Sequence, residues 1–192
     1  MNLIHPPVKF ECTKCGACCR QDSLLVTVTG RDIARIAIGL GLGPDEMIRA
    51  LDFYLTQNVE PLKGLRDIPA IKTERGLAYI ALKKLDNGDC VFLKDNLCMI
   101  HVIRPTVCRS FPFVFNDTGY EKTWGLSAMK EICPGLGSGP IIEISSLLQI
   151  ADDVLGDLDI YKKFCEEWNS RERKPTAKRI IEQILSDPRF TV

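Results

Sequence analysis

The residues most able to do chemistry are cysteines, and four of them stand within eight positions. Cys12, Cys15, Cys18 and Cys19 form the run Cys-x-x-Cys-x-x-Cys-Cys, which also contains Gly16. Small residues let a backbone curl around a bound centre and direct amide N–H groups at its sulfur atoms, which stabilises a negatively charged cluster. The alternative, a set of small buried apolar side chains, would seldom place four thiols so close together.

The spacing of this run bears on which metal it binds. Three cysteines at successive two-residue gaps are typical of ferredoxin-type iron–sulfur ligation, where a remote cysteine followed by proline completes the sites. Cys133 is followed by Pro134 and fits that position. Structural zinc more often uses separated Cys-x-x-Cys pairs. The run therefore favours an iron–sulfur cluster and leaves zinc as the alternative.

Four more cysteines lie outside the run: Cys90, Cys98, Cys108 and Cys133. Neighbouring side chains rarely point the same way. We therefore expect Cys18 and Cys19 to serve two centres, or one of them to contact the ligands without binding the metal itself. Eight thiols in all would satisfy two four-thiolate centres.

Charged and aromatic residues surround Cys108 in Arg104-Pro-Thr-Val-Cys108-Arg109-Ser-Phe-Pro-Phe. A four-thiolate centre carries a net charge of about −2, and its burial requires counter-charges or hydrogen bonds. Arg104 and Arg109 would supply both if they face the centre, and neither if they are surface residues. The phenylalanines at 111, 113 and 115 would either shield the centre or pack as ordinary strand residues. We expect His101 to be structural because eight thiols suffice without it.

Taken in order, these motifs resemble the CxxCxxCC cysteine-cluster family, the YkgJ-like group described as zinc- or iron-chelating. The resemblance covers roughly residues 10–134, although His101 stands where the family has an aromatic residue. It implies that zinc or an iron–sulfur (4Fe–4S) cluster is bound by Cys12, Cys15, Cys18, Cys19, Cys90, Cys98, Cys108 and Cys133. The cysteine motif is also similar to that of flagellin lysine N-methylase, which is associated with an iron–sulfur cluster.

Composition narrows the class of protein. Twenty-five basic residues balance twenty-five acidic ones, so the chain lacks the charge excess that nucleic acids and anionic membranes attract. Its sequence has no apolar run of membrane-spanning length and no secretory leader pattern. We therefore expect a cytoplasmic protein with no nucleic-acid or membrane partner, and a protein partner stays open. Cytosol keeps thiols reduced, and nine is an odd number, so metal ligation is favoured over disulfides.

The elements that position the cysteines predict an α+β fold: a small Cys-rich core of short strands and loops with packed helices and a helical C-terminal part. We expect residues 1–140 to form the cysteine-cluster metal-binding domain and residues 141–192 a helical extension packed on it. Thr29 followed by Asp32 predicts the capped start of a helix. A second helix is expected over residues 44–55, because proline is favoured at a first helical position.

Nearer the later cysteines, residues 90–93 and 98–101 are expected to pair as strands across the turn 94–97, which would bring Cys90 close to Cys98. Residues 133–140 predict a loop rich in glycine and proline. Apolar residues then recur at alternating spacings of four and three, which predicts a long helix with one apolar face. Cys165 lies on that face, so we expect it to pack in the core and not to bind metal.

Three functions follow as hypotheses. The first is an iron–sulfur protein with one or two clusters, for electron transfer or cluster-supported chemistry. The second is a zinc-binding structural or interaction protein with two four-thiolate sites. The third, suggested by the methylase resemblance, is an S-adenosylmethionine-dependent protein lysine methylase-like activity. No catalytic residue can be assigned from the sequence, so whether the chain is an enzyme stays open.

Overall fold

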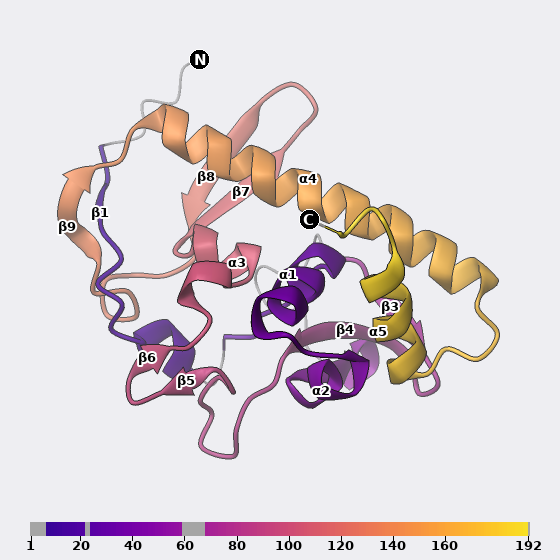
Figure 1. Cartoon of the computed structure of the whole chain (residues 1–192). Coiled ribbons are helices and arrows are strands. Elements are labelled where there is room, and N and C mark those ends of the chain that lie inside the picture. The colour runs from indigo at the N-terminus through magenta and orange to yellow at the C-terminus, as the bar shows by residue number, and fades with distance from the viewer. Residues whose placement is uncertain (1–6, 22–23, 59–67, 192) are drawn as a thin grey trace.

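Helices and short antiparallel strands make up the computed structural model, which describes residues 7–21, 24–58 and 68–191 (Figure 1). This confirms the predicted α+β class. The helices are α1 (Gly30–Leu40), α2 (Pro44–Arg49), α3 (Thr106–Ser110), α4 (Ile144–Arg171) and α5 (Ala177–Ser186), with single turns of 3-10 helix at η1 (Ala17–Arg20), η2 (Thr56–Asn58) and η3 (His101–Ile103). The strands are β1 (Lys9–Phe10), β2 (Leu51–Leu55), β3 (Ile71–Thr73), β4 (Gly76–Leu82), β5 (Leu93–Lys94), β6 (Leu97–Cys98), β7 (Phe113–Asp117), β8 (Lys122–Leu126) and β9 (Leu136–Ile141).

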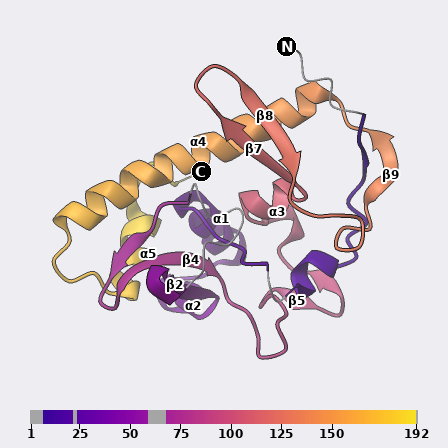
Figure 2. The same ribbon diagram turned by 180° about the vertical axis from the view of Figure 1, so that it is seen from behind.

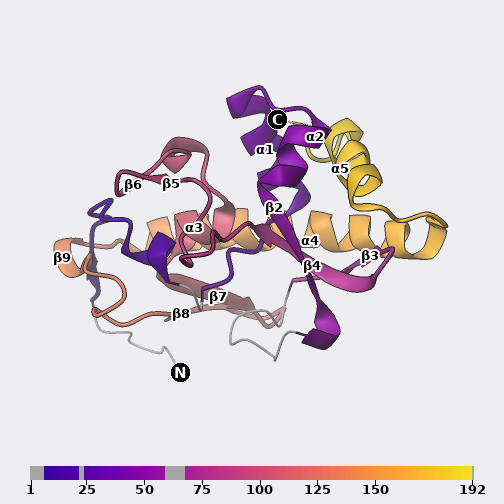
Figure 3. The same cartoon turned by 90° about the horizontal axis from the view of Figure 1, so that it is seen from below.

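These elements form two groups at opposite ends of the molecule, and the long helix α4 extends across both groups. One end holds the three-stranded sheet β2-β4-β3 with α1, α2 and α5, and the other holds α3 and the pairs β1-β9, β5-β6 and β7-β8 (Figures 2 and 3). Helix α4 contacts β3 and α1 at the first end and α3, β7 and β8 at the second. Of the described helices, none has both the length and the apolar character needed to cross a bilayer.

The main hydrophobic core lies at the first end and draws on both halves of the chain. Ile33 of α1, Ile80 of β4, Phe164 of α4 and Ile181 of α5 are each at most 2% exposed and belong to one cluster. Cys165 lies in this core at 1% exposure, as the helical periodicity predicted. A domain boundary near residue 140 stays a prediction.

The start of α1 is capped as predicted. The Thr29 side chain accepts a hydrogen bond from the backbone N–H of Asp32, and the Asp32 carboxylate accepts one from the backbone N–H of Thr29 at 3.0 Å. This reciprocal box satisfies two of the backbone donors that a helix start leaves unpaired.

Two sequence expectations were wrong. The helix expected over 44–55 ends at Arg49, and Leu51–Leu55 forms β2, which pairs along its whole length with β4. Leucine, phenylalanine and tyrosine pack well on a pleated surface, so the available partner strand decides the conformation of this short apolar run. Likewise the loop expected over 133–140 contains strand β9, which pairs with β1 across an irregular register.

Candidate metal centre

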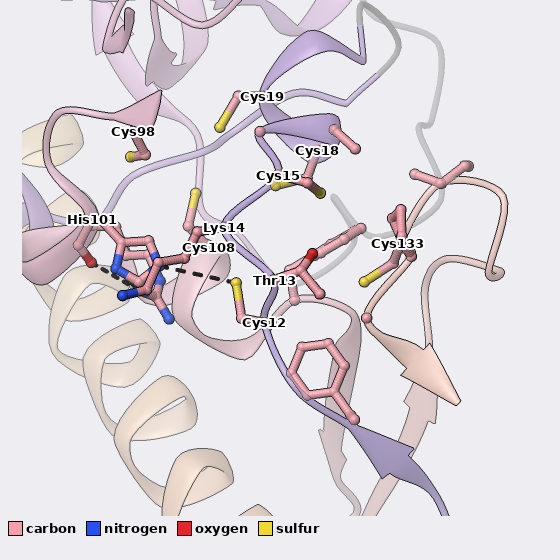
Figure 4. A pocket seen from close by; sticks show the side chains of 18 residues that line it. Cys12, Thr13, Lys14, Cys15, Cys18, Cys19, Cys98, His101, Cys108 and Cys133 are labelled. Atoms are coloured by element: carbon pink, nitrogen blue, oxygen red, sulfur yellow. Dashed lines mark hydrogen bonds between the residues drawn. The ribbon is translucent and has the colours of Figure 1, made fainter. Parts of the chain in front are cut away.

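All eight predicted ligand cysteines come together around two adjoining cavities. One cavity of about 80 Å³, which we call the outer cavity, is lined by Cys12, Cys15, Cys18, Cys19, Cys98, Cys108 and Cys133 (Figure 4). A second cavity of about 70 Å³, the inner cavity, is lined by Cys90 together with Cys18, Cys19, Cys98 and Cys108. Segments far apart in the sequence therefore bring their thiols to one place. Cys165 lines neither cavity.

Pairing of β1 with β9 joins the two ends of the motif. Phe10 lies opposite Leu136, and the backbone N–H of Glu11 donates to the carbonyl oxygen of Gly135 at 3.3 Å. Cys12 directly follows β1 and Cys133 shortly precedes β9, so this pairing brings Cys133 to the first cysteine run.

The contact depends on a glycine at position 135. A Cβ atom there would lie 2.3 Å from the backbone carbonyl oxygen of Glu11, so a side chain would force the two segments apart. Gly135→Ala is expected to lower the metal content of the purified protein, measured by elemental analysis, by displacing Cys133 from Cys12. Gly156→Ala is the matched control, because a Cβ at that helical position meets nothing within 4 Å. Equal metal content in the two variants would contradict this account of the β1–β9 contact.

The first cysteine run is held against the β5–β6 hairpin. Arg20 donates through Nη1 to the carbonyl oxygen of Cys15 at 3.1 Å and through Nη2 to the side-chain oxygen of Asn96. Gly16 has a φ of +69°, and a Cβ there would lie 2.9 Å from the Asn96 carbonyl oxygen. The cysteine motifs do not by themselves point to Arg20 or Asn96. Their positions, directly after the run and inside the predicted turn, are the available clues.

The hairpin itself confirms the predicted pairing in a shorter form. Strands β5 and β6 place Leu93 opposite Cys98, and the turn between them contains Asp95 and Asn96 with positive φ. The backbone N–H of Cys90 donates to the carbonyl oxygen of Cys19 at 2.8 Å. Cys90 and Cys98 thus line the inner cavity together, as expected.

Cys108 is positioned by a helix whose start is anchored to α1. The backbone N–H and the hydroxyl of Thr106 donate to Oδ1 of Asp32 at 2.9 and 2.8 Å. Arg35 donates to the same carboxylate, and Asp32 is 1% exposed. The residue that caps α1 therefore also fixes α3, a role that the sequence alone did not indicate.

Three of the thiols that line both cavities are linked by hydrogen bonds. The side chain of Cys19 bonds those of Cys18 and Cys98, which lowers the pKa of Cys18 to about 7 and that of Cys98 to about 6, and raises the pKa of Cys19. The positive charge of Arg104 further lowers the pKa of Cys98. Burial raises the pKa of Cys108. Since thiolates are the metal-binding form, Cys18 and Cys98 are ready to bind near neutral pH.

Backbone N–H groups outside the first cysteine run also point at sulfur atoms. Hydrogen bonds from the amides of Gly135 and Leu136 lower the pKa of Cys133, although burial raises it overall. Amides of Phe92 and Ile100 serve Cys90 and Cys98 in the same way. Such donors stabilise ligating thiolates and tune a bound cluster.

The two predicted arginines differ in position. Arg104 lines both cavities, contacts the ring of His101 through Nη1, and donates to the His101 carbonyl oxygen at 2.8 Å. Arg109 lines neither cavity and forms an ion pair of 3.5 Å with Asp153 of α4. His101 lines the outer cavity, with Nε2 4.0 Å from Sγ of Cys12. Arg104 is thus placed to offset negative charge at the thiols, and Arg109 is directed elsewhere.

The three phenylalanines also separate. Phe111 lines both cavities, which is the position that shielding would require. Phe113 instead packs edge-on against Phe10 and Trp124, with ring centroids 5.4 and 5.8 Å apart. Phe115 lines a different cavity beside α4.

The donor set fits zinc or iron–sulfur chemistry. No aspartate or glutamate is among the described residues that line either cavity, whereas Lys14, His101 and Arg104 are. Thiolates without carboxylates select soft sites such as zinc and iron–sulfur clusters. The thiols lie along the cavity walls: within the described parts of the chain, no three Cys, His, Asp or Glu side chains meet closely enough to enclose a single ion.

Comparison with known proteins agrees with this donor set. The model of the CxxCxxCC family, described as a "putative zinc- or iron-chelating domain", matches residues 11–134. The chain belongs to this family. The resemblance seen in the cysteine motifs is thereby confirmed, and membership supports metal binding with zinc or iron as the metal.

A full-length relative extends the similarity beyond the motifs. An uncharacterized protein of Methanocaldococcus jannaschii is 29% identical over 185 residues, which cover 93% of this chain and 84% of that protein. No solved structure matches the chain. The link to flagellin lysine N-methylase stays a prediction.

Proposed function

We propose that this member of the CxxCxxCC family binds one or two 4Fe–4S clusters through its eight clustered cysteines and uses them for electron transfer or cluster-supported chemistry. The observation that carries the proposal is the convergence of eight thiols, with no carboxylate among the described lining residues, on two adjoining cavities. A bound 4Fe–4S cluster supplies one-electron redox chemistry, and the protein tunes it through ligands, hydrogen bonds and burial.

The size of the cavities favours clusters over single ions. A zinc ion bonded to four thiolates at about 2.3 Å fills the space between them. A cluster also contains bridging sulfides and several irons, so the thiolates that hold it must line the wall of a hollow. Cavities of about 80 and 70 Å³ with thiols on their walls have that form.

The surroundings of the thiols match a buried anionic cluster. Arg104 and the backbone amides near Cys90, Cys98 and Cys133 offset thiolate charge that would be costly to bury unpaired. Phe111 contributes apolar surface to both cavities, and apolar surroundings affect the potential of a bound cluster. In this proposal the cysteines bind the cluster, Arg104 offsets its charge, and Phe111 supplies apolar surroundings.

The deciding experiment is elemental analysis of protein purified without oxygen. Iron and acid-labile sulfide are expected in equal amounts, about four of each per centre, with a broad absorption band near about 400 nm. Colourless protein that contains zinc and no sulfide would overturn the iron–sulfur proposal. That result would support the second candidate, a zinc-binding structural or interaction protein with two four-thiolate sites, because eight thiols suffice for two tetrahedral ions.

A further inference from the structure

The eight thiols do not have equal access to the two cavities. Cys12, Cys15 and Cys133 line the outer cavity alone, and Cys90 lines the inner cavity alone. The other four form a wall between the cavities: Cys18, Cys19, Cys98 and Cys108. A division into two sets of four is therefore decided by how this wall is shared.

Position in the fold assigns the thiols of the wall. Cys98 lies opposite Leu93 in the β5–β6 hairpin, and the backbone N–H of Leu93 donates to the carbonyl oxygen of Cys90 at 2.8 Å. Cys19 and Cys98 lie on the opposite side of the cavity from Cys133 (Figure 4).

Cys19 is also tied to the inner side of the wall. Its carbonyl oxygen accepts a hydrogen bond from the backbone N–H of Cys90 at 2.8 Å. Cys18 stands between the sets and completes the outer one, which otherwise has three thiols. This leaves a full inner set of Cys19, Cys90, Cys98 and Cys108.

The two sets differ in exposure. Cys12 and Cys15 are exposed to solvent, in a segment whose neighbours Thr13 and Lys14 are exposed as well. Cys90 is 5% exposed and belongs to the main hydrophobic core, with Ile100 and Leu82 beside it in the inner cavity. A small thiol in solution can therefore reach two ligands of the outer set, whereas no thiol of the inner set is exposed: Cys90 is buried and the other three are partly buried.

Resting on the proposed binding of metal by these cysteines, we infer that the chain holds two centres of different function: an outer centre that exchanges its metal with external thiols, and an inner centre that stays bound and stabilises the fold. The ligand class is a thiol, either a small one or cysteines of an accepting protein. In the exchange step the incoming sulfur bonds to the metal, the Cys12 or Cys15 sulfur leaves, and the proton of the incoming thiol passes to the departing thiolate. No oxidation or reduction takes place.

The test follows metal release from anaerobic, metal-loaded protein mixed with glutathione and a chromogenic chelator for the metal found. Two phases of equal amplitude are expected, with the fast phase at least about ten-fold faster and accelerated by glutathione. A single phase that releases all metal would overturn the inference.

Variants assign the phases. Cys12→Ser, at an exposed position, is expected to abolish the fast phase and about half of the bound metal while the protein stays folded. Cys98→Ser is expected to abolish the slow phase, with thermal unfolding and circular dichroism recording how much fold remains. Cys165→Ala, in the core, should leave both phases unchanged. Loss of all metal in folded Cys12→Ser would show one shared centre and overturn the inference.

The two proposals fail in different ways. Zinc in place of iron and sulfide, released in two phases, would overturn the iron–sulfur proposal and leave the division into two centres standing. Iron and sulfide released in one phase would support the iron–sulfur proposal and overturn the division into two centres.

Discussion

Cys18→Ser is expected to cause the largest loss of bound metal of any single ligand change, because Cys18 completes the outer set and also lines the inner cavity, so that its loss weakens both centres. The Cys18 thiol lies on the wall between the cavities, and its pKa is lowered to about 7 by the hydrogen bond from Cys19, so it is a ready thiolate near neutral pH. Serine keeps the shape of the side chain and removes the soft donor. We expect metal affinity to fall by more than the ~10–100-fold that loss of an outer-shell partner costs.

Stability should fall with the metal, because ligand binding and folding are coupled. The expected loss in the free energy of unfolding is of the order of 4–5 kcal/mol, the range reached when a protein loses a bound metal. Elemental analysis and urea unfolding under anaerobic conditions measure the two effects. Cys165→Ala is the matched control: this core thiol lines neither cavity, so metal content should not change. Stoichiometric loss of metal in Cys165→Ala would contradict our assignment of the ligands.

Asp32→Ala is expected to give the largest loss of stability outside the cysteines. Asp32 is 1% exposed, and its carboxylate accepts hydrogen bonds from Thr29, Arg35 and Thr106. Removal of a cap costs about 0.5–2 kcal/mol, and removal of one partner of a buried ion pair about 3–5 kcal/mol. Because these terms overlap at one side chain, we expect a total loss of about 3–5 kcal/mol in the free energy of unfolding, measured by urea titration.

The same substitution tests how α3 is positioned. Without Asp32, the start of α3 loses two hydrogen bonds at Thr106, so Cys108 should be held less firmly and metal content should fall. Asp159→Ala, which removes an exposed carboxylate from α4, is the control and should change neither quantity appreciably. Asp32→Asn keeps a side-chain oxygen as an acceptor, so its stability and metal content are expected to lie between those of Asp32→Ala and of the unchanged protein. Full metal content in a destabilised Asp32→Ala would show that Cys108 does not depend on this anchor.

Local features of the fold were predictable because short segments of sequence specify them. Thr29 and Asp32 interact within one helical turn, and the apolar face that carries Cys165 repeats at helical spacing whatever it packs against. The run Leu51–Leu55 was not predictable in this way, because a short apolar segment adopts a strand or a helix according to its partner. Its partner, β4, lies about 25 residues further along the chain.

The candidate site also has features that local sequence specifies and features that depend on distant parts of the chain. The prediction of a soft metal site needed no distant contacts, because the residue type and close spacing of Cys12, Cys15 and Cys18 are typical of such sites. Long-range packing instead places Cys90 and Cys133 at different cavities, and it turns Arg104 toward the thiols while Arg109 pairs with Asp153 of α4. Spacing along the chain does not specify the direction of a side chain or its neighbouring residues, because both depend on elements that long-range packing brings together.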